Sequence, residues 1–351
     1  MDAFFPTATT QHQPAFEVIE GGTQVPYSDV PERVDRVVQA LRSSGLAQAR
    51  PAPAWDPSLL TQLHSRDYLD FLRHGFSDWQ QAGAQLGWSS VGPLLPALSS
   101  PRRPLSRGAA SLQSVFARAG YYILDQAAPL TAGTWAAALD SAGCAVAAAQ
   151  AALESGRSAF AICRPPGHHA GRDFAGGFCY LNNAGVAAQV LQSALGARVA
   201  IVDIDYHAGH GTQDLFYDRA DVVTLSLHAD PAHEYPFFFG HADEQGTGPG
   251  LGFHRNLPLP LGIDDAGYLS ALDTGLAWLG GHAPSALVVS AGLDLYRGDP
   301  VGRFAISRRG LAQIGGRLAA LRLPTVVVLE GGYNVDELGE LCVELLSPLG
   351  A

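Results

Sequence analysis

Five short apolar runs, separated by helical patterns, constrain the fold of this chain most strongly. The runs are almost continuous and rich in β-branched residues, as in strands buried on both faces of a parallel sheet: Ala159–Cys163, Val199–Asp203, Val222–Leu227, Ala286–Ser290 and Thr325–Leu329. Helices are predicted at Pro31–Leu41, Pro57–Leu72, Trp135–Glu154, Asn183–Leu195, Ala266–Leu279 and Ser307–Arg322. This alternation predicts an α/β fold with an open, doubly wound, mostly parallel sheet and helices on both faces.

Length and composition favour one large unit. The chain has 351 residues, 47% of them hydrophobic, which is enough for one large α/β domain or two smaller ones. Residues 80–108 are rich in Gly, Pro and Ser, which indicates a functional or interaction loop. Because no segment resembles a linker, we expect a single domain over residues 1–351 with a long loop inserted at about 80–108.

Cysteine usage and charge limit the compartment and the partners. The four cysteines show no C-x-x-C spacing and lie mostly in apolar segments, so we expect free thiols in a reducing, cytoplasmic setting. The first residues lack the pattern of a signal peptide, and no apolar run approaches the length of a membrane span. A net charge of −11 argues against a nucleic-acid partner.

Polar side chains follow each predicted strand. In open α/β sheets, ligands bind at the carboxyl ends of the strands, and glycines there let the backbone approach a ligand. The five strand ends are followed by these groups: His168 and His169; Asp203, Asp205 and His207; Ser226 and His228; Asp294; and Tyr333 after Gly331-Gly332. A purely structural role would have to explain all five ends at once.

The two carboxylates and one imidazole at alternate positions after Val202 are the sharpest cluster. On a strand, Asp203, Asp205 and His207 would point to one side. Burying carboxylates together is costly without a cation, so the cluster is either a structural ion network or a metal site. His207, Asp205 and Asp294 together would suit Zn²⁺ with an open position, where the metal lowers the pKa of water to near neutrality.

Three further side chains complete a hydrolytic centre. His168 and His169 could act as general base and general acid. Tyr333, on a Gly-Gly turn, could donate its hydroxyl to a developing oxyanion. Individually, a His-His pair is often a solvated turn and such a tyrosine often a packing residue. Together with Zn²⁺ they predict hydrolysis of an acyl bond.

At these residues the chain resembles the zinc-dependent histone deacetylase family, most closely its bacterial acetylpolyamine amidohydrolase branch. The resemblance runs from about Gly21 to Leu345, and its motifs are 164-RPPGHHA-170, 177-GFCYLNN-183, 203-DIDYH-207, 211-GTQD-214, 226-SLH-228, 290-SAGLD-294 and 330-EGGY-333. It implies the arginase–deacetylase fold and removal of acetyl or short acyl groups from an aliphatic amine. The expected substrate is an acetylpolyamine or a related small acetylated amine, with acetyl-lysine in proteins or peptides as the alternative.

The resemblance also implies roles for individual residues. Asp205, His207 and Asp294 would hold Zn²⁺, with His168 and His169 as the tandem catalytic histidines, His169 as the likelier base by this resemblance, and Tyr333 polarising the acetyl carbonyl. A structural K⁺ would be bound by Asp203, Asp205, His207, Ser226 and Leu227, and a second near Phe216, Arg219, Val222 and Asn256. Asp203 would also orient His168. Gly177, Phe178 and Tyr235 would form the substrate tunnel, with aromatic walls suited to an aliphatic stem.

The chain departs from the family pattern in two places. His210 stands where the family has the Asn or Asp partner of the second catalytic histidine, and a nearby imidazolium would lower the pKa of that base. Polyamine-specific members carry acids at the tunnel mouth, where this chain has Val18, Phe116 and Val301, with Glu17 and Glu20 nearby. The 80–108 loop still resembles that branch, in which it narrows the entrance and supports a homodimer.

Three other readings remain open at this point. An arginase-like ureohydrolase would need two Mn²⁺ and an Asp-x-Asp on the later strand, where this chain has Asp294-Leu295-Tyr296. A binding module would capture acylated amines without turnover. Fe²⁺ in place of Zn²⁺ is compatible with one nitrogen and two oxygen ligands.

Overall fold

A single large parallel sheet organises the molecule. The computed structural model describes residues 1–19, 22–100 and 111–350. Every strand pairing in this sheet is parallel, in the order β4-β1-β5-β10-β9-β6-β7-β8. Its strands are β1 (Asp2–Phe5), β4 (Gln48–Pro51), β5 (Ala159–Ala161), β6 (Val199–Asp203), β7 (Val222–Ala229), β8 (His254–Leu259), β9 (Ala286–Ala291) and β10 (Thr325–Leu329). β2 (Phe16–Ile19) and β3 (Thr23–Pro26) form a separate antiparallel hairpin.

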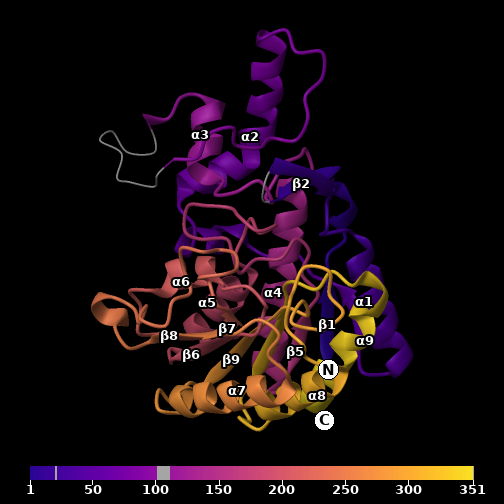
Figure 1. Cartoon of the computed structure of the whole chain (residues 1–351), viewed down its shortest axis with the longest axis vertical. Helices are drawn as coiled ribbons and strands as arrows, with labels where there is room; N and C mark the ends of the chain where they lie inside the picture. The colour runs from indigo at the N-terminus through magenta and orange to yellow at the C-terminus, as the bar shows by residue number, and fades with distance from the viewer. Residues whose placement is uncertain (20–21, 101–110, 351) are drawn as a thin grey trace.

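Helices cover both faces of the sheet. One face is packed by α1 (Glu32–Ser44), α7 (Asp265–Gly280), α8 (Arg308–Ala319) and α9 (Val335–Leu346), and the other by α4 (Thr134–Ser155) and α5 (Asn183–Leu195). Beyond the sheet, α2 (Arg66–Gln85) and α3 (Val115–Tyr122) rise at the top of Figure 1, and the short α6 (His210–Phe216) follows β6. The three-layer arrangement confirms the predicted α/β class.

Alternation along the central strands divides the core in two. In β6, Val199 and Ile201 join the cluster with α4 and α5, while Ala200 and Val202 join the cluster with α7 and α8. All five residues of β6 are buried. A strand buried on both faces needs apolar side chains at successive positions, which explains the continuous runs in the sequence.

The predicted bounds of an element match the structure best where the apolar pattern stops at a helix cap or a turn residue. β6, β10 and α5 have the predicted bounds, and α5 is capped by Asn182, whose side chain accepts a hydrogen bond from the Gly185 N–H. The single helix predicted over Pro57–Leu72 is wrong. A 3-10 turn covers Pro57–Gln62, and α2 then starts after the Ser65 cap. Because α2 continues to Gln85, the loop predicted from residue 80 starts later, and its residues 101–110 lie outside the described part.

Short strands at the edges of the sheet were not predicted. β1 and β4 have four residues each, and β8 contains polar residues and Pro258. Edge strands are only partly covered, so their sequences lack the continuous apolar run that identifies the central strands.

Helix α4 is long and apolar enough to cross a membrane, by length and composition alone, although no apolar run of the sequence was expected to reach that length. In the structure 72% of its most apolar 18-residue window is buried. It packs against α5, β5 and β10, as a core helix does.

Candidate active site

The site lies at the carboxyl edge of the sheet, where four adjacent strands end. In the sheet order β5-β10-β9-β6, the loop after β5 places His168 and His169, and the turn after β10 places Tyr333. Asp294 follows β9, and Asp205 follows β6. Since parallel strands share one carboxyl edge, residues far apart in the sequence meet there.

The predicted strand geometry of the first cluster is wrong, although its members do meet. β6 ends at Asp203, so Asp205 and His207 are not on the strand. The Oδ1 atom of Asp203 accepts the Asp205 N–H at 3.0 Å, and Oδ1 of Asp205 accepts the His207 N–H at 2.8 Å. Each carboxylate therefore accepts a hydrogen bond from the backbone N–H two residues later. This forms a local turn, which aspartate favours over strand pairing.

Asp205, His207 and Asp294 form a convergent set of metal donors. Their donor atoms all lie within 4.8 Å of one another. Nδ1 of His207 is 3.2 Å from Oδ1 of Asp205 and 3.2 Å from Oδ2 of Asp294. Among the described residues, Oδ2 of Asp294 is buried without a hydrogen-bond partner of good geometry. A buried oxygen left in this state is costly unless a cation binds it.

The pKa values of Asp205, His207 and Asp294 are shifted because these groups are buried close together. Burial and the neighbouring Asp205 raise the pKa of Asp294 to about 7. Burial opposes protonation of His207, but its close contacts with the carboxylates of Asp205 and Asp294 raise its pKa to about 10. Burial also opposes ionisation of Asp205, yet the charge of His168 and the bonds from His207 lower its pKa. A divalent cation would offset the same repulsion between carboxylates.

The tandem histidines differ in charge although they are adjacent. Nδ1 of His168 is 3.0 Å from Oδ2 of Asp203. Burial lowers the pKa of His168, but Asp205 and Asp203 outweigh it and raise the pKa to about 10. Burial, followed by the charges of His168, His210 and His207, holds the pKa of His169 well below its usual range. The surroundings of the two rings therefore shift their pKa values in opposite directions, up for His168 and down for His169.

Asp203 and Glu330 hold the loop of the histidines. Asp203 contacts both His168 and the Asp205 N–H, and its role in orienting His168 stays a prediction. Oε2 of Glu330 accepts the Gly167 N–H at 2.6 Å and the His168 N–H at 3.1 Å, and Oε1 accepts the Ser290 hydroxyl at 2.9 Å. No local sequence pattern indicates this role of Glu330, because its partners lie in the loop after β5 and on β9.

His210 contacts His169, the histidine that it was predicted to partner. Its Nδ1 lies 3.1 Å from Nδ1 of His169. Its ring stacks between Phe174 and Phe239, at 5.5 Å from each and with interplanar angles of 3° and 10°. One of the two Nδ1 atoms must donate and the other accept, so the tautomers of His169 and His210 are linked.

Tyr333 is held in place by its backbone. Oδ2 of Asp299 accepts the Tyr333 N–H at 2.6 Å and the Asn334 N–H at 3.0 Å. Nε of Arg33 donates to the Gly332 carbonyl at 2.8 Å, and its guanidinium lies 5.1 Å from the centre of the Tyr333 ring. Burial raises the pKa of Tyr333 well above its usual value, so the phenol keeps its proton. Asp299 and Arg33 were missed, because no local pattern connects them to Tyr333.

Phe178 and Tyr235 come from two loops far apart in the sequence, and each ring lies beside a catalytic side chain. The Phe178 ring lies 5.5 Å from that of Tyr333, and the Tyr235 ring lies 5.1 Å from that of His169 at 89°. Gly177 and Phe178 both have left-handed backbones, with φ of 47° and 66°. A Cβ at Gly177 would come within 2.3 Å of the His169 ring, so only glycine fits there.

The residues predicted for the first potassium site lie on β6, on β7 and in the turn after β6. In the β6–β7 register Asp203 pairs with Ser226, and both line a small interior cavity together with Thr212 and Gln213. Ser226 Oγ is 2.7 Å from Nδ1 of His228. Leu227 is the next residue of β7.

The second predicted potassium group spans two elements. Phe216 ends α6, Arg219 lies in the following turn, and Val222 begins β7. Asn256 is on β8, where its Nδ2 donates to Oε1 of Gln213 at 3.0 Å.

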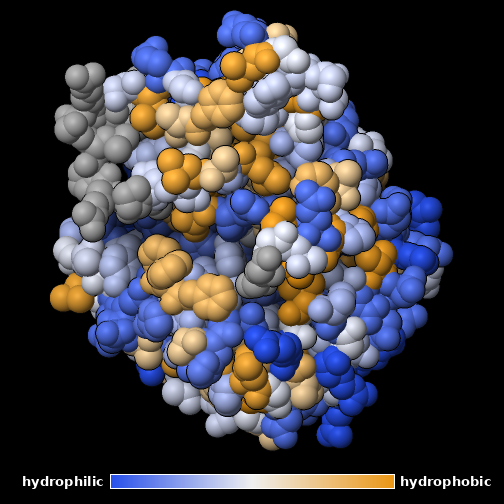
Figure 2. All heavy atoms as spheres, turned by 45° about the horizontal axis from the view of Figure 1, so that its top comes forward, coloured by the Kyte–Doolittle hydropathy of each residue, from blue (hydrophilic) through white to orange (hydrophobic). Residues whose placement is uncertain are grey.

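The two acids considered for the tunnel mouth have different outcomes. The Glu17 side chain is buried, and its Oε1 accepts hydrogen bonds from the Ser28 N–H at 3.1 Å and hydroxyl at 2.5 Å. Burial raises its pKa to about 7. Glu20 lies outside the described residues. Near the tunnel, Phe237 is 41% and Phe238 80% exposed, and hydrophobic patches alternate with hydrophilic ones on the face that Figure 2 turns forward.

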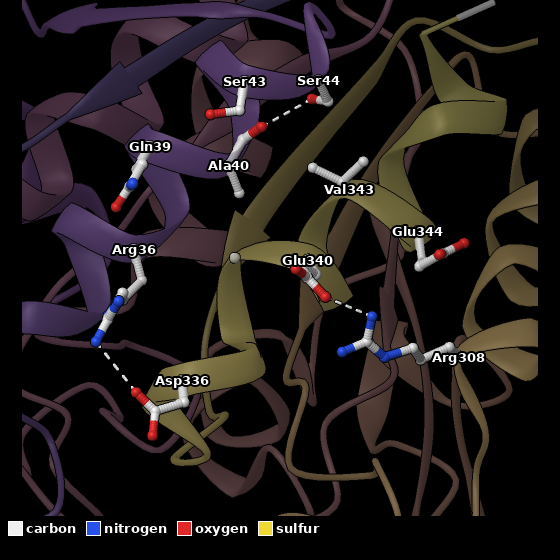
Figure 3. A pocket seen from close by; sticks show the side chains of 11 residues that line it. Arg36, Gln39, Ala40, Ser43, Ser44, Arg308, Asp336, Glu340, Val343 and Glu344 are labelled. Atoms are coloured by element: carbon white, nitrogen blue, oxygen red, sulfur yellow. Dashed lines mark hydrogen bonds and ion pairs between the residues drawn. The ribbon is translucent and has the colours of Figure 1, made fainter.

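A separate surface groove runs between α1 and α9. Arg36 and Asp336 approach to 3.1 Å across it, and Arg308 and Glu340 to 2.5 Å beside it (Figure 3). Its other lining residues are Gln39, Ala40, Ser43, Ser44, Gly339, Val343 and Glu344. None of the candidate site residues lines this groove, so it is unrelated to the chemistry at the strand ends.

Comparison with known proteins agrees with this geometry. The model of the histone deacetylase domain matches residues 27–349. Acetylpolyamine amidohydrolase 1 of Pseudomonas aeruginosa is 41% identical over 330 residues, which cover 94% of this chain and 93% of the relative. Acetylpolyamine amidohydrolase of Mycoplana ramosa is 36% identical over 320 residues, with 91% of each chain covered.

Solved structures show the same fold. The crystal structure of acetylpolyamine aminohydrolase from Burkholderia pseudomallei superposes with a TM-score of 0.93 at 38% identity, covering 100% of this chain and 99% of that one. The HDA15 HD domain gives a TM-score of 0.78 at 27% identity, covering 99% and 88%. These similarities confirm the predicted arginase–deacetylase fold, and the chain therefore belongs to the histone deacetylase family of amide-hydrolysing enzymes.

Proposed function

We propose that the protein is a zinc-dependent amidohydrolase that removes acetyl groups from small aliphatic amines, with acetylpolyamines as the leading substrates. The observation that supports this most directly is the convergence of Asp205, His207 and Asp294 beside the tandem histidines His168 and His169. The relatives named as acetylpolyamine amidohydrolases support the substrate class.

The donor set fits one zinc ion per chain. Asp205, His207 and Asp294 supply one nitrogen and two carboxylates, which leaves an open position for substrate. Zn²⁺, when bound, polarises the amide carbonyl and activates a water molecule. Fe²⁺ suits the same donors. Leu295 and Tyr296 follow Asp294, so the chain lacks the Asp-x-Asp that a ureohydrolase would use there to bridge two Mn²⁺.

The protein side chains then divide the proton transfers. His169 is neutral and accepts the proton of the attacking water. His168, whose Nδ1 contacts the Asp203 carboxylate and whose pKa is raised, donates a proton to the departing amine. Tyr333 keeps its hydroxyl proton and donates a hydrogen bond to the acetyl oxygen as negative charge develops there.

Structural potassium would support this arrangement from behind. Asp203 and Ser226 line a small interior cavity, and Leu227 follows Ser226 on β7. A K⁺ held there, with Asp205 and His207, would balance the buried carboxylates. The turn from Phe216 to Val222, with Asn256, is proposed as the second potassium site.

A second candidate substrate is acetyl-lysine in a peptide. Glu17 is turned inward to Ser28, and it is thereby removed from the exposed rim where a distant ammonium would need an anion. Phe237 and Phe238 instead present exposed rings beside the tunnel. Such a rim suits a peptide backbone or an apolar extension as well as a polyamine.

The assembly and setting are further proposals. All four cysteines are buried and free, which fits a reducing cytoplasm. We infer a homodimer that acts on a small molecule, without a nucleic-acid or membrane partner. Light scattering after size-exclusion chromatography tests the dimer, and a monomeric mass at micromolar concentration would contradict it.

A substrate panel tests the function. Acetylputrescine, acetylcadaverine, acetylspermidine and acetyl-lysine peptides are compared by kcat/KM with the zinc-loaded protein, while emission spectrometry counts the metal. The proposal expects one zinc per chain and the highest kcat/KM on an acetylpolyamine. A preference for peptides would favour the second candidate, and zinc binding without acetate release from any amide would indicate a binding module.

A further inference from the structure

Asp125 stands between the two aromatic walls of the site. It follows α3 in a segment fixed to the loop of the first wall, where the Leu124 N–H donates to the Ala175 carbonyl at 2.8 Å. Asp125 is half-buried. Its carboxylate accepts hydrogen bonds from Ala127, Gly177 and Tyr235, which are neither metal donors nor catalytic histidines.

One oxygen of this carboxylate contacts both walls. Oδ2 of Asp125 accepts the Gly177 N–H at 2.9 Å, directly before Phe178. The same Oδ2 accepts the Tyr235 hydroxyl at 2.6 Å. Oδ1 accepts the Ala127 N–H at 2.9 Å, which fixes the carboxylate itself. A short bond from a phenol to a carboxylate is among the stronger hydrogen bonds in proteins.

The packing around this contact is tight. A Cβ at Gly176 would come within 2.9 Å of Oδ2 of Asp125 and 3.2 Å of the Tyr235 hydroxyl. The hydroxyl and carboxylate therefore press against bare backbone. The Tyr235 ring is also perpendicular to His169, so a swing of this ring would alter the space directly beside the catalytic base.

We propose that Asp125 and the Tyr235 hydroxyl form a clamp that fixes the distance between the walls of Phe178 and Tyr235, and thereby selects substrates with an unbranched aliphatic stem. This inference rests on the proposed amidohydrolase function. A Tyr235 ring that is held both by its backbone and by its hydroxyl cannot move aside for a branch on the substrate stem. Without the hydroxyl bond, the ring can rotate on its loop. Asp125 is thus a positioning residue that acts through Tyr235 and Gly177.

The clamp is tested by a selectivity ratio. N-acetylcadaverine and its analogue with a methyl branch on the stem are compared by kcat/KM in the wild type, Tyr235→Phe and Asp125→Asn. Wild type should prefer the unbranched amide by tenfold or more, since one methyl group changes binding in a fitted pocket by about 10-fold to 200-fold. Tyr235→Phe should reduce that ratio about tenfold, because kcat/KM rises on the branched amide relative to the unbranched one.

Two controls separate the clamp from general stability. Tyr121→Phe removes a hydroxyl that lies 3.3 Å from the Asp173 carboxylate, and it should leave the ratio unchanged. The double variant Tyr235→Phe/Asp125→Asn should change the ratio no more than the larger single change, because both remove one interaction. An unchanged ratio in Tyr235→Phe, with a melting temperature like that of wild type, would overturn the clamp.

Calorimetry distinguishes failure of the clamp from failure of the proposed function. The dissociation constants of both amides are measured with the same three proteins. If wild type binds the unbranched amide without hydrolysing it, the proposed function fails, and the clamp still requires a reduced ratio of dissociation constants in Tyr235→Phe. If wild type binds neither amide, the clamp is refuted together with the substrate class.

Discussion

The floor of the site and its entrance are built in different ways. On the floor, Glu330 and Asp203 bind backbone N–H groups of loops that leave central strands, so its geometry depends on the sheet itself. At the entrance, Phe178 and Tyr235 stand on loops and are joined through Asp125. Changes on the floor should therefore affect every substrate, while changes at the entrance should redistribute preference among substrates.

Removing a metal donor should have the largest effect and would test the floor directly. Asp294→Ala is expected to lose bound zinc, measured by emission spectrometry, and to lower kcat about 10³-fold or more on every amide, since the metal supplies several kcal/mol of stabilisation to the transition state. Asp273→Ala, on an exposed carboxylate paired with Arg317, is the control. Retained zinc and activity in Asp294→Ala would refute the assigned donor set.

Tyr333→Phe should have the next largest effect. Loss of its hydroxyl should lower kcat about 10²-fold to 10³-fold with little change in KM and no loss of zinc, because the hydrogen bond strengthens as charge develops on the acetyl oxygen. Tyr217→Phe, on a half-buried ring beside His254, is the matched control. A rise in KM with kcat unchanged would instead place Tyr333 among the entrance residues.

His210→Asn would test the point at which this floor differs from its family. The charge of His210 helps to hold the pKa of His169 down. Replacing it by a neutral amide should raise that pKa, so the base is protonated at higher pH and the acid limb of the kcat/KM profile moves upward by about half a unit to one unit. The shift should be equal for branched and unbranched amides. Superimposable profiles for wild type and variant would contradict the coupling of the two rings.

Glu17→Gln should have the smallest effect, and it acts on stability rather than catalysis. Burial raises the pKa of Glu17 to about 7, from about 4.5 for an ordinary glutamate in water. Between these values the folded chain keeps a proton that the unfolded chain has released, so the free energy of unfolding falls as pH rises. The variant should remove about 1–3 kcal/mol of this decline between pH 5 and pH 8.

Urea unfolding at both pH values measures this difference. Glu32→Gln, on an exposed carboxylate at the start of α1, is the control for the loss of charge alone. An equal decline in wild type and Glu17→Gln would show that the proton is held elsewhere.

The floor could be predicted from the sequence to a much larger extent than the entrance. β6, β10 and α5 are visible as apolar runs and caps, and the polar residues after them meet because parallel strands end together. The contacts of Asp125 and Asp299 join loops far apart in the sequence, and no periodicity encodes them. The stacking of His210 between Phe174 and Phe239 was equally invisible, since it depends on how three loops fold over one another.

The position of β10 in the sheet has a consequence for synthesis of the protein. β10 comes late in the chain, yet it lies between β5 and β9 in the centre of the sheet. A nascent chain that still lacks residues 325–333 cannot close the sheet, and it cannot join the histidine loop to the aspartate loops through Glu330. Folding on the ribosome would therefore leave the catalytic centre unformed until translation has passed these residues, which limits premature hydrolysis by incomplete chains.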